Sequence, residues 1–418
     1  MPGGNTRSTV FREPYPVYAA RGRGSRIIDA DGVERIDFSN NYTALVHGHA
    51  HPRIVAAARR AIEGGSCFGA PTESEIRLAE ALSERVPSFE QVRFMNSGTE
   101  AVMMAVKAAR AFTGRRKIAK CEGAYHGGYD FVEVSVAPGE GQRGPAREPA
   151  AVPSGPGTWP SVITDTVILP FNDAAAATRI LSAHRRDLAA VVIDPLPNRL
   201  GLIPASAEFL SAVARFCKAN AVLLISDEVI SFRLHPAGAQ GKFRYAADLT
   251  VLGKLIGGGF PVGAVAGRED IMAVFDPRET GPLVAHAGTL NANPVTMAAG
   301  LAALELLTPA AIASLDELGG RCREEIRRAI GASGLPWQVS GMGSLFRIHP
   351  IPGPLRDYRS ARATPDAAGV LTTIMTGLLN FGVFIDTGGF GCTSTVMDEG
   401  NATHLGWALA AAFSADAS

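Results

Sequence analysis

Asp227 and Lys254 are the two residues of this 418-residue sequence whose types and positions point most directly to chemistry. Each follows a short apolar run, residues 221–225 for the aspartate and residues 249–252 for the lysine. Such runs are typical of buried parallel strands, and residues just past the carboxyl ends of these strands face the ligand crevice of an open α/β sheet. A lysine there can form a Schiff base, and a carboxylate can keep a pyridinium nitrogen protonated. The pair therefore predicts pyridoxal phosphate (PLP) chemistry.

Each member of the pair also has a structural interpretation. Asp227 can be a buried acid in an ion pair, and Lys254 can be an exposed lysine in a loop. The apolar neighbours Leu252 and Ile256 argue against an exposed loop, and the chain has only six lysines, so one placed between an apolar run and three glycines is notable. After transimination, in which the substrate amine replaces Lys254 in the Schiff base, the freed amine of Lys254 could move a proton at the substrate Cα.

The segment Ser97-Gly98-Thr99 has residue types that suit a phosphate group. It follows a predicted strand at 92–95 and opens a predicted helix that runs through residue 112. Backbone N–H groups and hydroxyls at a helix N-terminus attract anions. Ser or Thr can also act simply as a helix cap, so the phosphate interpretation depends on the Asp227 and Lys254 pair downstream.

Two further segments are candidates for the same pocket. Tyr125 and His126 follow a predicted strand at 118–121, and an aromatic side chain at a strand end can stack on a flat ring, although a tyrosine in the core is the simpler alternative. Thr289 lies in a short polar segment before a long predicted helix that begins after Asn293-Pro294, and its hydroxyl could contact a phosphate.

Composition limits the class of protein. The 40 acidic and 40 basic residues cancel, which argues against a surface that binds nucleic acid, and 46% hydrophobic residues are ordinary for a soluble enzyme. The N-terminus has no apolar signal core, and no run reaches the length of a membrane span. The five cysteines are scattered, with no C-x-x-C. We therefore expect a cytoplasmic protein without nucleic-acid or membrane partners.

Three histidines, His47, His49 and His51, invite a metal interpretation. Their spacing fits no common zinc pattern, and Gly48 and Pro52 indicate a loop. We favour a structural loop or pocket wall and expect no metal.

The pattern of elements predicts an α/β fold with two domains. Strand-like runs alternate with helical stretches, which indicates a mostly parallel sheet covered by helices. These runs lie at 118–121, 167–169, 191–193, 222–225, 249–252 and 262–266. A hairpin is expected around Asp31-Gly32, strands at 341–348 and 383–385, and a closing helix at 405–413. We predict an N-terminal arm at 1–50, a large domain at 51–300 and a small domain at 301–418.

Residues 137–160 interrupt this pattern. They are rich in Gly and Pro and show little apolar periodicity. A loop of this length in a compact domain is either functional or disordered, so both an active-site flap and a passive insertion remain open.

Taken together, the motifs resemble those of the class III, fold type I PLP-dependent aminotransferases. The matching segments, in the family's order, are MNSGTEAVMMAVKAAR, EGAYHGG, SDEVISFR, LGKLIGGGFPVGAVAGREDIM and HAGTLNANPVTMAAG. The sub-groups most similar to the chain are glutamate-1-semialdehyde aminomutases and the aminotransferases of β-phenylalanine and D-phenylglycine type. The resemblance implies a large domain with a mostly parallel seven-stranded sheet, and a smaller α/β domain built from both termini.

The resemblance also implies roles for individual residues. Lys254 would carry the Schiff base and Asp227 would contact the ring nitrogen, with Val229 and Tyr125 on the two ring faces and His126 beside them. Ser97, Gly98 and Thr99 would hold the phosphate. Thr289 would reach the phosphate of a neighbouring subunit, which implies a homodimer with shared active sites. The opening MPGGNTRS resembles the β-amino-acid group, in which the arginine at the position of Arg7 binds a substrate carboxylate, and Tyr42 would then line the pocket.

Two segments depart from the family pattern. Many members have a Glu-Pro pair after the strand at 191–193, whereas this chain has Asp194-Pro195. The β-amino-acid enzymes have an arginine near the C-terminus where this chain reads DTGGFG, residues 386–391. These departures place the choice of substrate in question.

Three functions remain open at this stage. The first is an aminotransferase that moves an amino group from an amino acid, of β- or aromatic type, to a 2-oxo acid. The second is an aminomutase or an amino-acid racemase, which would use the same residues. The third is a non-catalytic protein of the same fold, which the intact Lys254 and Asp227 argue against. The Arg7 match favours transamination, and no P-loop or dinucleotide-binding motif supports another class.

Overall fold

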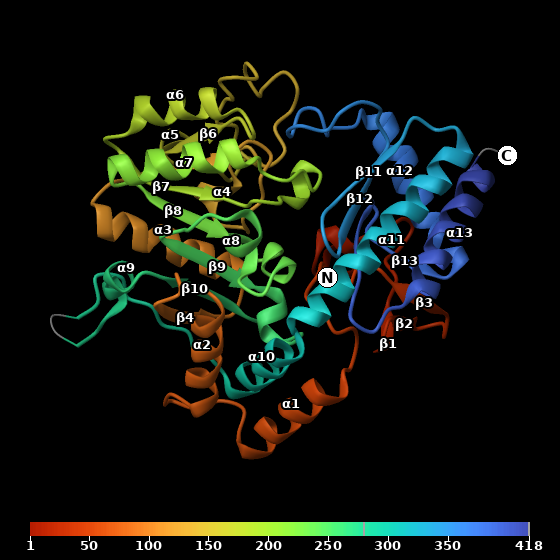
Figure 1. Ribbon diagram of the computed structural model, residues 1–418, viewed down its shortest axis with the longest axis horizontal. Coiled ribbons are helices and arrows are strands. Elements are labelled where there is room, and N and C mark those ends of the chain that lie inside the picture. The colour runs from red at the N-terminus through yellow and green to blue at the C-terminus, as the bar shows by residue number, and fades with distance from the viewer. Residues whose placement is uncertain (279–280, 417–418) are drawn as a thin grey trace. The chain divides into compact units, whose positions relative to one another are not determined.

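The computed structural model describes residues 1–278 and 281–416, which divide into two compact units (Figure 1). Unit 1 combines Met1–Val55, Ala310–Leu355 and Ala361–Ser418. Unit 2 consists of Ala56–Pro309 and the short segment Arg356–Ser360.

Unit 2 is built on a seven-stranded sheet of order β4-β10-β9-β8-β7-β5-β6. Its strands are β4 (Gln91–Met95), β5 (Lys117–Cys121), β6 (Thr166–Leu169), β7 (Leu188–Ile193), β8 (Leu223–Asp227), β9 (Leu249–Gly253) and β10 (Gly263–Gly267). Strand β10 is antiparallel to both of its neighbours, β4 and β9, whereas the other pairs are parallel. The predicted mostly parallel, seven-stranded sheet is therefore confirmed.

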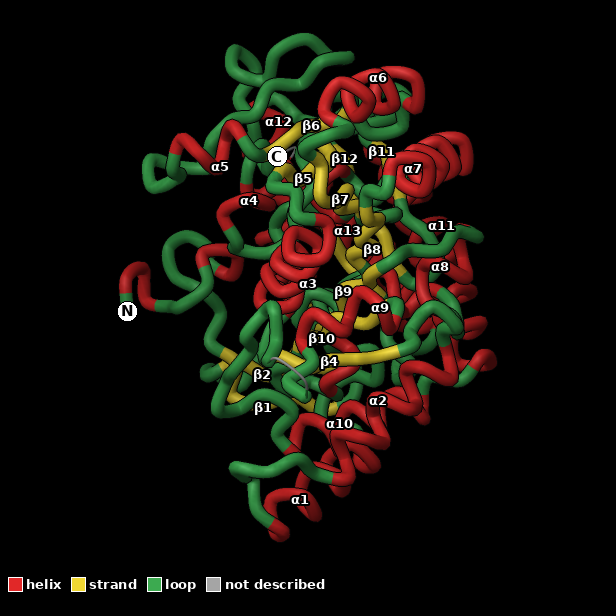
Figure 2. Tube along the Cα trace, turned by 90° about the vertical axis from the view of Figure 1, so that its left-hand side faces the viewer, coloured by secondary structure: helices red, strands yellow, loops and turns green. Residues whose placement is uncertain are grey.

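Helices cover both faces of this sheet (Figure 2). The helices between residues 52 and 306 are α1 (Pro52–Gly64), α2 (Glu73–Arg85), α3 (Gly98–Thr113), α4 (Asp130–Glu133), α5 (Pro160–Thr164), α6 (Ala174–His184), α7 (Ala207–Asn220), α8 (Gly238–Phe243), α9 (Glu269–Met272) and α10 (Pro294–Leu306). In Figure 2, α3 and α4 lie on one side of the strands and α6 and α7 on the other. A parallel sheet needs this double cover, because both of its faces are apolar.

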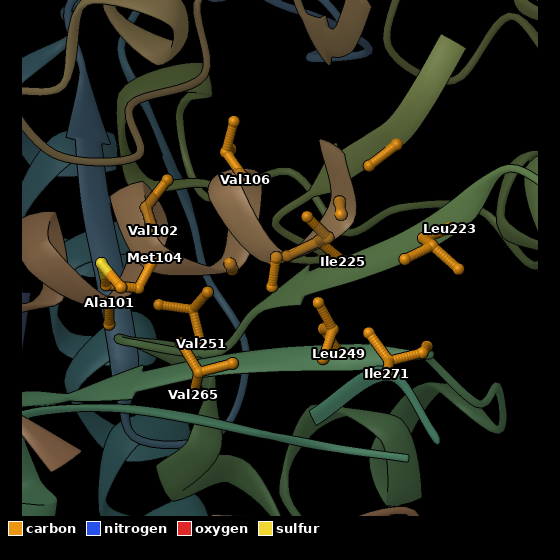
Figure 3. Packing of buried hydrophobic residues seen from close by; sticks show 14 of the residues in the cluster. Ala101, Val102, Met104, Val106, Leu223, Ile225, Leu249, Val251, Val265 and Ile271 are labelled. Atoms are coloured by element: carbon orange, nitrogen blue, oxygen red, sulfur yellow. The ribbon is translucent and has the colours of Figure 1, made fainter. Parts of the chain in front are cut away.

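The strands at the centre of the sheet in unit 2 are apolar because they are completely buried. All six residues of β7 and all five of β8 are buried. Figure 3 shows buried side chains of α3 and of the strands, among them Ala101, Ile225 and Val251, which belong to one hydrophobic cluster. Burial of each valine or isoleucine side chain contributes about 1.5–3 kcal/mol, so this packing holds the strand ends firmly in place.

Unit 1 contains two small sheets and three long helices. The first sheet has the order β1-β2-β3-β13, and the second has the order β11-β12-β14. The strands are β1 (Ala19–Arg23), β2 (Arg26–Asp29), β3 (Glu34–Asp37), β11 (Gln338–Ser340), β12 (Leu345–His349), β13 (Val383–Phe384) and β14 (Phe390–Cys392), and the helices are α11 (Pro309–Ser333), α12 (Pro365–Gly377) and α13 (Glu399–Asp416). Since β13 pairs with β3, segments from both ends of the chain form one unit, as the sequence predicts.

Two boundaries in unit 1 differ from the prediction. The expected strand at 341–348 begins only at Leu345, because Gly341 and Gly343 have φ angles of 136° and 55°, which no β-strand adopts. The expected helix at 405–413 is the central part of the longer α13. The hairpin around Asp31-Gly32 is present as the antiparallel pair β2 and β3.

Two properties of the described residues concern membrane-spanning helices and disulfides. No single helix within 1–278 and 281–416 is long and apolar enough to cross a membrane; the consecutive pair α10 and α11 meets the length and composition together but is bent by 75°. None of the five cysteines forms a disulfide, and four of them are buried.

Candidate active site

The carboxyl ends of six strands meet at one edge of the sheet in unit 2. Strand β4 runs in the direction of β9, since both are antiparallel to β10, and β5 to β9 are mutually parallel. The register pairs Ile193 with Ser226 and Asp227 with Val251. The residues that follow β9, β8, β7 and β5 therefore come together, as expected of an α/β ligand crevice.

Asp227 is the last residue of β8, and its carboxylate is held by two donors. Oδ1 accepts a hydrogen bond from the backbone N–H of Val229 at 3.1 Å, and Oδ2 lies 2.8 Å from Nδ1 of His126. Both side chains are buried. Burial lowers the pKa of His126 although the Asp227 carboxylate acts in the opposite direction, so a neutral imidazole donates its Nδ1–H to the carboxylate. This contact fixes the orientation of the Asp227 carboxylate.

Lys254 is the first residue after β9, and its backbone has the left-handed φ of 49°. This conformation costs about 1–2 kcal/mol in a non-glycine residue, and such strain is concentrated at functional sites. Burial lowers the pKa of the Lys254 amine, while the carboxylates of Asp227 and Asp194 act to raise it. A lowered pKa increases the fraction of neutral amine, which is the nucleophilic form.

Asp194 is a site residue that the sequence argument noted only as a departure from the family pattern. It follows β7 directly, is buried, and accepts a hydrogen bond from Leu196 N at 2.9 Å. Its pKa lies well above the usual range because of burial and the nearby Asp227 carboxylate. The positional rule that identified Asp227 applies equally to this residue, since both follow buried parallel strands.

The N-terminus of α3 offers hydroxyl groups and backbone donors at the end of β4. Ser97 caps the helix, and its Oγ accepts a hydrogen bond from Glu100 N at 3.1 Å. Thr99 Oγ1 accepts a hydrogen bond from Gly128 N at 3.1 Å. Each hydroxyl keeps its own proton for donation, and the first N–H groups of a helix have no partner within it. This arrangement suits an anion.

Gly127 requires the absence of a side chain, and Gly98 leaves little room for one. A Cβ at Gly98 would lie 3.2 Å from a methyl group of Val229. Gly127 has a φ of 91°, and a Cβ there would lie 2.6 Å from Thr99 Oγ1. The two glycines let α3, Val229 and the turn after Tyr125 approach one another closely.

Tyr125 is 46% exposed, so it is not the core tyrosine that the sequence left open. Its ring lies 5.0 Å from the guanidinium carbon of Arg199. Val229 is partly buried beside Gly98 and Gly253. The assignment of Tyr125 and Val229 to the two faces of the cofactor ring stays a prediction.

These residues fit PLP. The group carries a phosphate, a pyridine nitrogen and an aldehyde. The helix N-terminus at Ser97 to Thr99 suits the phosphate, the Asp227 carboxylate suits a protonated ring nitrogen, and the amine of Lys254, whose pKa is lowered by burial, suits the aldehyde. The donor set therefore matches the chemistry of the cofactor.

Thr289 and the three histidines occupy other surroundings. Thr289 is exposed, and its backbone carbonyl lies 3.5 Å from Cys67 Sγ. His49 pairs with the Asp37 carboxylate at 2.7 Å, and His47 contacts Thr395 Oγ1 at 2.9 Å. Within residues 1–278 and 281–416, no group of three or more His, Cys, Asp or Glu side chains is placed to hold a metal ion.

Arg7 and Tyr42 belong to unit 1, where both line a cavity of about 330 Å³. Arg7 Nη1 donates a hydrogen bond to Asn41 Oδ1 at 2.8 Å. The hydroxyl of Tyr42 lies 2.7 Å from the carbonyl of Thr9 and 3.0 Å from Oδ2 of Asp386. Burial and the Asp386 carboxylate raise the pKa of Tyr42 to about 12, so this hydroxyl remains protonated as a donor.

Arg12 lines the same cavity and was not identified from the sequence. It is buried, donates a hydrogen bond to the carbonyl of Ile385, and lies 5.2 Å from the centre of the Phe384 ring. Burial lowers its pKa, and the Asp386 carboxylate opposes this effect. No local pattern around Arg12 predicts a buried guanidinium, because its partners lie more than 370 residues away along the chain.

The chain is similar to characterised proteins over nearly its whole length. The family model described as aminotransferase class-III matches residues 9–389. A beta-phenylalanine transaminase from Variovorax paradoxus is 41% identical over 392 residues, which cover 93% of this chain and 84% of that protein. A glutamate-1-semialdehyde 2,1-aminomutase from Methanothermobacter thermautotrophicus is 39% identical over 393 residues, covering 94% and 90%. The crystal structure of an omega-transaminase from Sphaerobacter thermophilus has a TM-score of 0.96 and 50% identity, covering 99% and 94%.

Proposed function

We propose that this chain, which belongs to the class III aminotransferases and uses PLP, transfers the amino group of a β- or aromatic amino acid to a 2-oxo acid. The observation that carries the proposal is the convergence of Lys254, Asp227 and the N-terminus of α3 at one edge of the sheet. The preference for a β- or aromatic donor is supported by the similarity to the beta-phenylalanine transaminase.

The residues of the chain have separate tasks in this reaction. Bound PLP would supply an electron sink for the negative charge that develops at the substrate carbon bearing the amino group, which is Cβ in a β-amino acid and Cα in an α-amino acid. Asp227, held by His126 and by Val229 N–H, keeps the ring nitrogen protonated through its opposite charge. Lys254 would hold the cofactor and, once its amine is free, move the proton at that carbon. The hydroxyl groups of Ser97 and Thr99 hold the phosphate.

We further propose that the cavity of unit 1 selects the substrate through Arg7 and Tyr42. Within the described residues, the Arg7 side chain makes one hydrogen bond, to Asn41, and so keeps other N–H groups for a ligand. A guanidinium binds a carboxylate in a bidentate fashion, which fixes the orientation of an amino acid. Tyr42 adds a protonated hydroxyl to the same cavity.

A homodimer in which Thr289 contacts the phosphate of the partner subunit is the third part of the proposal. Three large apolar side chains close to Thr289 in the chain, or next to its contact, are exposed: Leu290 follows it, Leu283 lies six positions before it, and Phe68 adjoins Cys67, whose thiol lies 3.5 Å from the Thr289 carbonyl. Exposed apolar side chains are common at interfaces. Light scattering after gel filtration tests the proposal: the native chain should have twice the monomer mass, and Leu290→Asp should reduce it. A monomeric native chain would remove the shared site.

A specific observation also favours an aminomutase. The 39% identity to a glutamate-1-semialdehyde 2,1-aminomutase extends over 393 residues, against 392 residues for the 41% identity to the transaminase. Mutase activity would need a single substrate and no 2-oxo acid, whereas transfer needs an acceptor.

The test is the visible absorbance of the PLP-loaded protein before and after addition of single amino acids without an acceptor. Transamination predicts a yellow band that bleaches with donors such as β-phenylalanine and returns when a 2-oxo acid is added. A band that no donor bleaches would favour the aminomutase, and the absence of any band after addition of PLP would contradict the proposal.

A further inference from the structure

The segment Arg356–Ser360 lies in unit 2, although the chain on either side of it belongs to unit 1. From its contacts, we propose that Arg359 is a positioning residue for the cofactor site: together with Tyr358 it fixes the turn that presents Tyr125 and His126. This role goes beyond the transfer reaction, because Arg359 would act without contacting cofactor or substrate.

The first support for the proposal is a two-pronged ion pair between Arg359 and Glu122. Arg359 Nε lies 2.8 Å from Glu122 Oε2, and Nη2 lies 2.9 Å from Oε1. The side chains are 17% and 5% exposed, so water screens the pair weakly. Two parallel N–H to oxygen contacts fix the orientation of both side chains, which a single contact at the surface does not.

The same guanidinium also binds the long insertion at 137–160. Arg359 Nη1 donates a hydrogen bond to the carbonyl of Gly144 at 2.9 Å, and Nη2 lies 2.9 Å from the carbonyl of Arg143. The hydroxyl of Tyr358 lies 3.3 Å from the carbonyl of Pro138. One short segment thus holds the insertion at two places.

These contacts lead directly to the cofactor site through the turn at 122–126. Glu122 is the first residue after β5, and Tyr125 follows it by three positions. Gly123 has a φ of 76°, and a Cβ there would lie 2.2 Å from the Tyr358 ring, so the ring packs against the bare backbone of the turn. Behind the turn, the buried Lys120 amine lies 2.7 Å from the carbonyl of Ala124. The turn is therefore held at three consecutive residues just before the ring and the imidazole that the cofactor needs.

Loss of the Arg359 guanidinium should loosen both parts that it holds. The carbonyl of Arg143, whose peptide bond trypsin would cleave, would lose one of its two donors, the other being Ala150 N at 2.9 Å. The turn would lose its anchor at Glu122, and the contact between His126 and Asp227 would become less well defined. Weaker cofactor binding and faster cleavage of the insertion should then appear together.

The test compares three variants of the full-length protein. Arg359→Met removes the guanidinium, Glu122→Gln with Arg359→Met removes both charges so that no unpaired charge stays buried, and Arg359→Lys retains a cation without the two-pronged geometry. We measure the dissociation constant for PLP, the circular dichroism of the bound cofactor and the rate of trypsin cleavage after Arg143. We expect Arg359→Met and the double variant to bind PLP about tenfold more weakly and to be cleaved about tenfold faster, with partial rescue in Arg359→Lys.

Arg179→Met is the matched control. Arg179 also donates a hydrogen bond to a carbonyl of the insertion, that of Arg147 at 2.8 Å, but it is exposed and does not contact the turn. PLP affinity and the cofactor spectrum should be unchanged in this variant. Native PLP affinity and native circular dichroism in the folded double variant would overturn the proposal, even if cleavage became faster. PLP affinity, circular dichroism and cleavage rate do not depend on amino-group transfer. The role of Arg359 is therefore tested independently of the proposed function.

Discussion

The two groups of site residues rest on different kinds of backbone. In unit 2, Asp194, Asp227 and Lys254 stand at the ends of neighbouring buried strands, where the register of the sheet places them. In unit 1, Tyr42 lies within four consecutive residues of positive φ, Asn40 to Thr43, and contacts Asp386, which is 344 positions away along the chain. The first arrangement follows from the fold, whereas the second depends on loops.

We propose that this difference separates the residues of the chemistry, in unit 2, from the residues that select the substrate, in unit 1. A sheet edge held by apolar packing can present the same lysine and aspartate for many substrates, because the side chains that fix it are remote from the substrate. Loops can change without loss of the core, so they are the natural place for residues that choose a substrate. The segment 386–391, which departs from the family pattern, begins in such a loop before β14, and its residues Asp386 and Thr387 line the cavity of Arg7 and Tyr42.

The largest effect is expected from Lys254→Ala, which removes the amine to which the proposed function assigns the chemistry. Turnover should fall by more than about 10³-fold, because both covalent attachment and proton transfer are lost. Initial rates and the visible band of the PLP-loaded protein measure this effect. The exposed Lys218 on α7 provides the control, and Lys218→Ala should leave both unchanged. A yellow, active Lys254→Ala protein would refute the assignment.

Glu228 shows that position at the sheet edge does not by itself define a site residue. It follows Asp227, yet its carboxyl group points into the scaffold, where it accepts hydrogen bonds from Ala239 N at 2.6 Å and Gln240 Nε2 at 3.1 Å. Burial raises its pKa to about 7 from the usual 4.5. The folded state therefore keeps a proton that the unfolded state loses between these two pH values.

The second prediction follows from this proton. The contribution of Glu228 to stability should decrease by about 3 kcal/mol as pH rises from 4.5 to 7. Glu228→Gln should flatten this part of the pH dependence, measured as urea midpoints at pH 5 and pH 8. The exposed Glu208 serves as control, and Glu208→Gln should follow the native profile. Parallel profiles for the Glu228 variant and the native chain would contradict the raised pKa.

The sequence predicted the sheet edge well because its signals are local. An apolar run followed by a charged residue identified β8 with Asp227 and β9 with Lys254, and Ser97 was among the predicted caps of α3. The same reasoning could have included Asp194. Local patterns succeed where each strand is buried on both faces, since burial alone then determines the residue types.

The residues that sequence reasoning missed have partners far away in the chain. Arg12 contacts Ile385, and Arg359 contacts Glu122 from 237 positions away. In the sequence, a buried arginine of this kind cannot be told from an exposed one. The residues around Arg12 and around Arg359 show no helical or strand periodicity that would indicate burial. The expected strand at 341–348 failed for a local reason, since its glycines permit backbone angles that a strand excludes.

The third prediction tests the proposed role of the unit 1 cavity in substrate binding. Arg7→Ala should raise KM for carboxylated substrates about 30-fold, since loss of a charge-assisted hydrogen bond costs about 2 kcal/mol. The PLP content should stay native, because the chemistry resides in unit 2. Steady-state kinetics and cofactor absorbance measure the two effects, with Arg23→Ala on the exposed β1 as control. An unchanged KM would remove Arg7 from the substrate pocket.

The smallest effect is expected from Tyr42→Phe, which removes one hydroxyl and leaves the ring. This hydroxyl has one proton and two acceptors, the Thr9 carbonyl and the Asp386 carboxylate, and Asp386 keeps its bond from Gly388 N at 3.0 Å. The loss is therefore worth about 1 kcal/mol, or about fivefold in KM, with kcat and PLP content near native values. Kinetics on an amino donor and on its 2-oxo acid partner would show whether both substrates lose affinity. Equal increases in KM for the two substrates would make Tyr42 part of a common carboxylate site. A fall in kcat with native KM would instead assign Tyr42 to the chemistry, and it would contradict the proposal that unit 1 only selects the substrate.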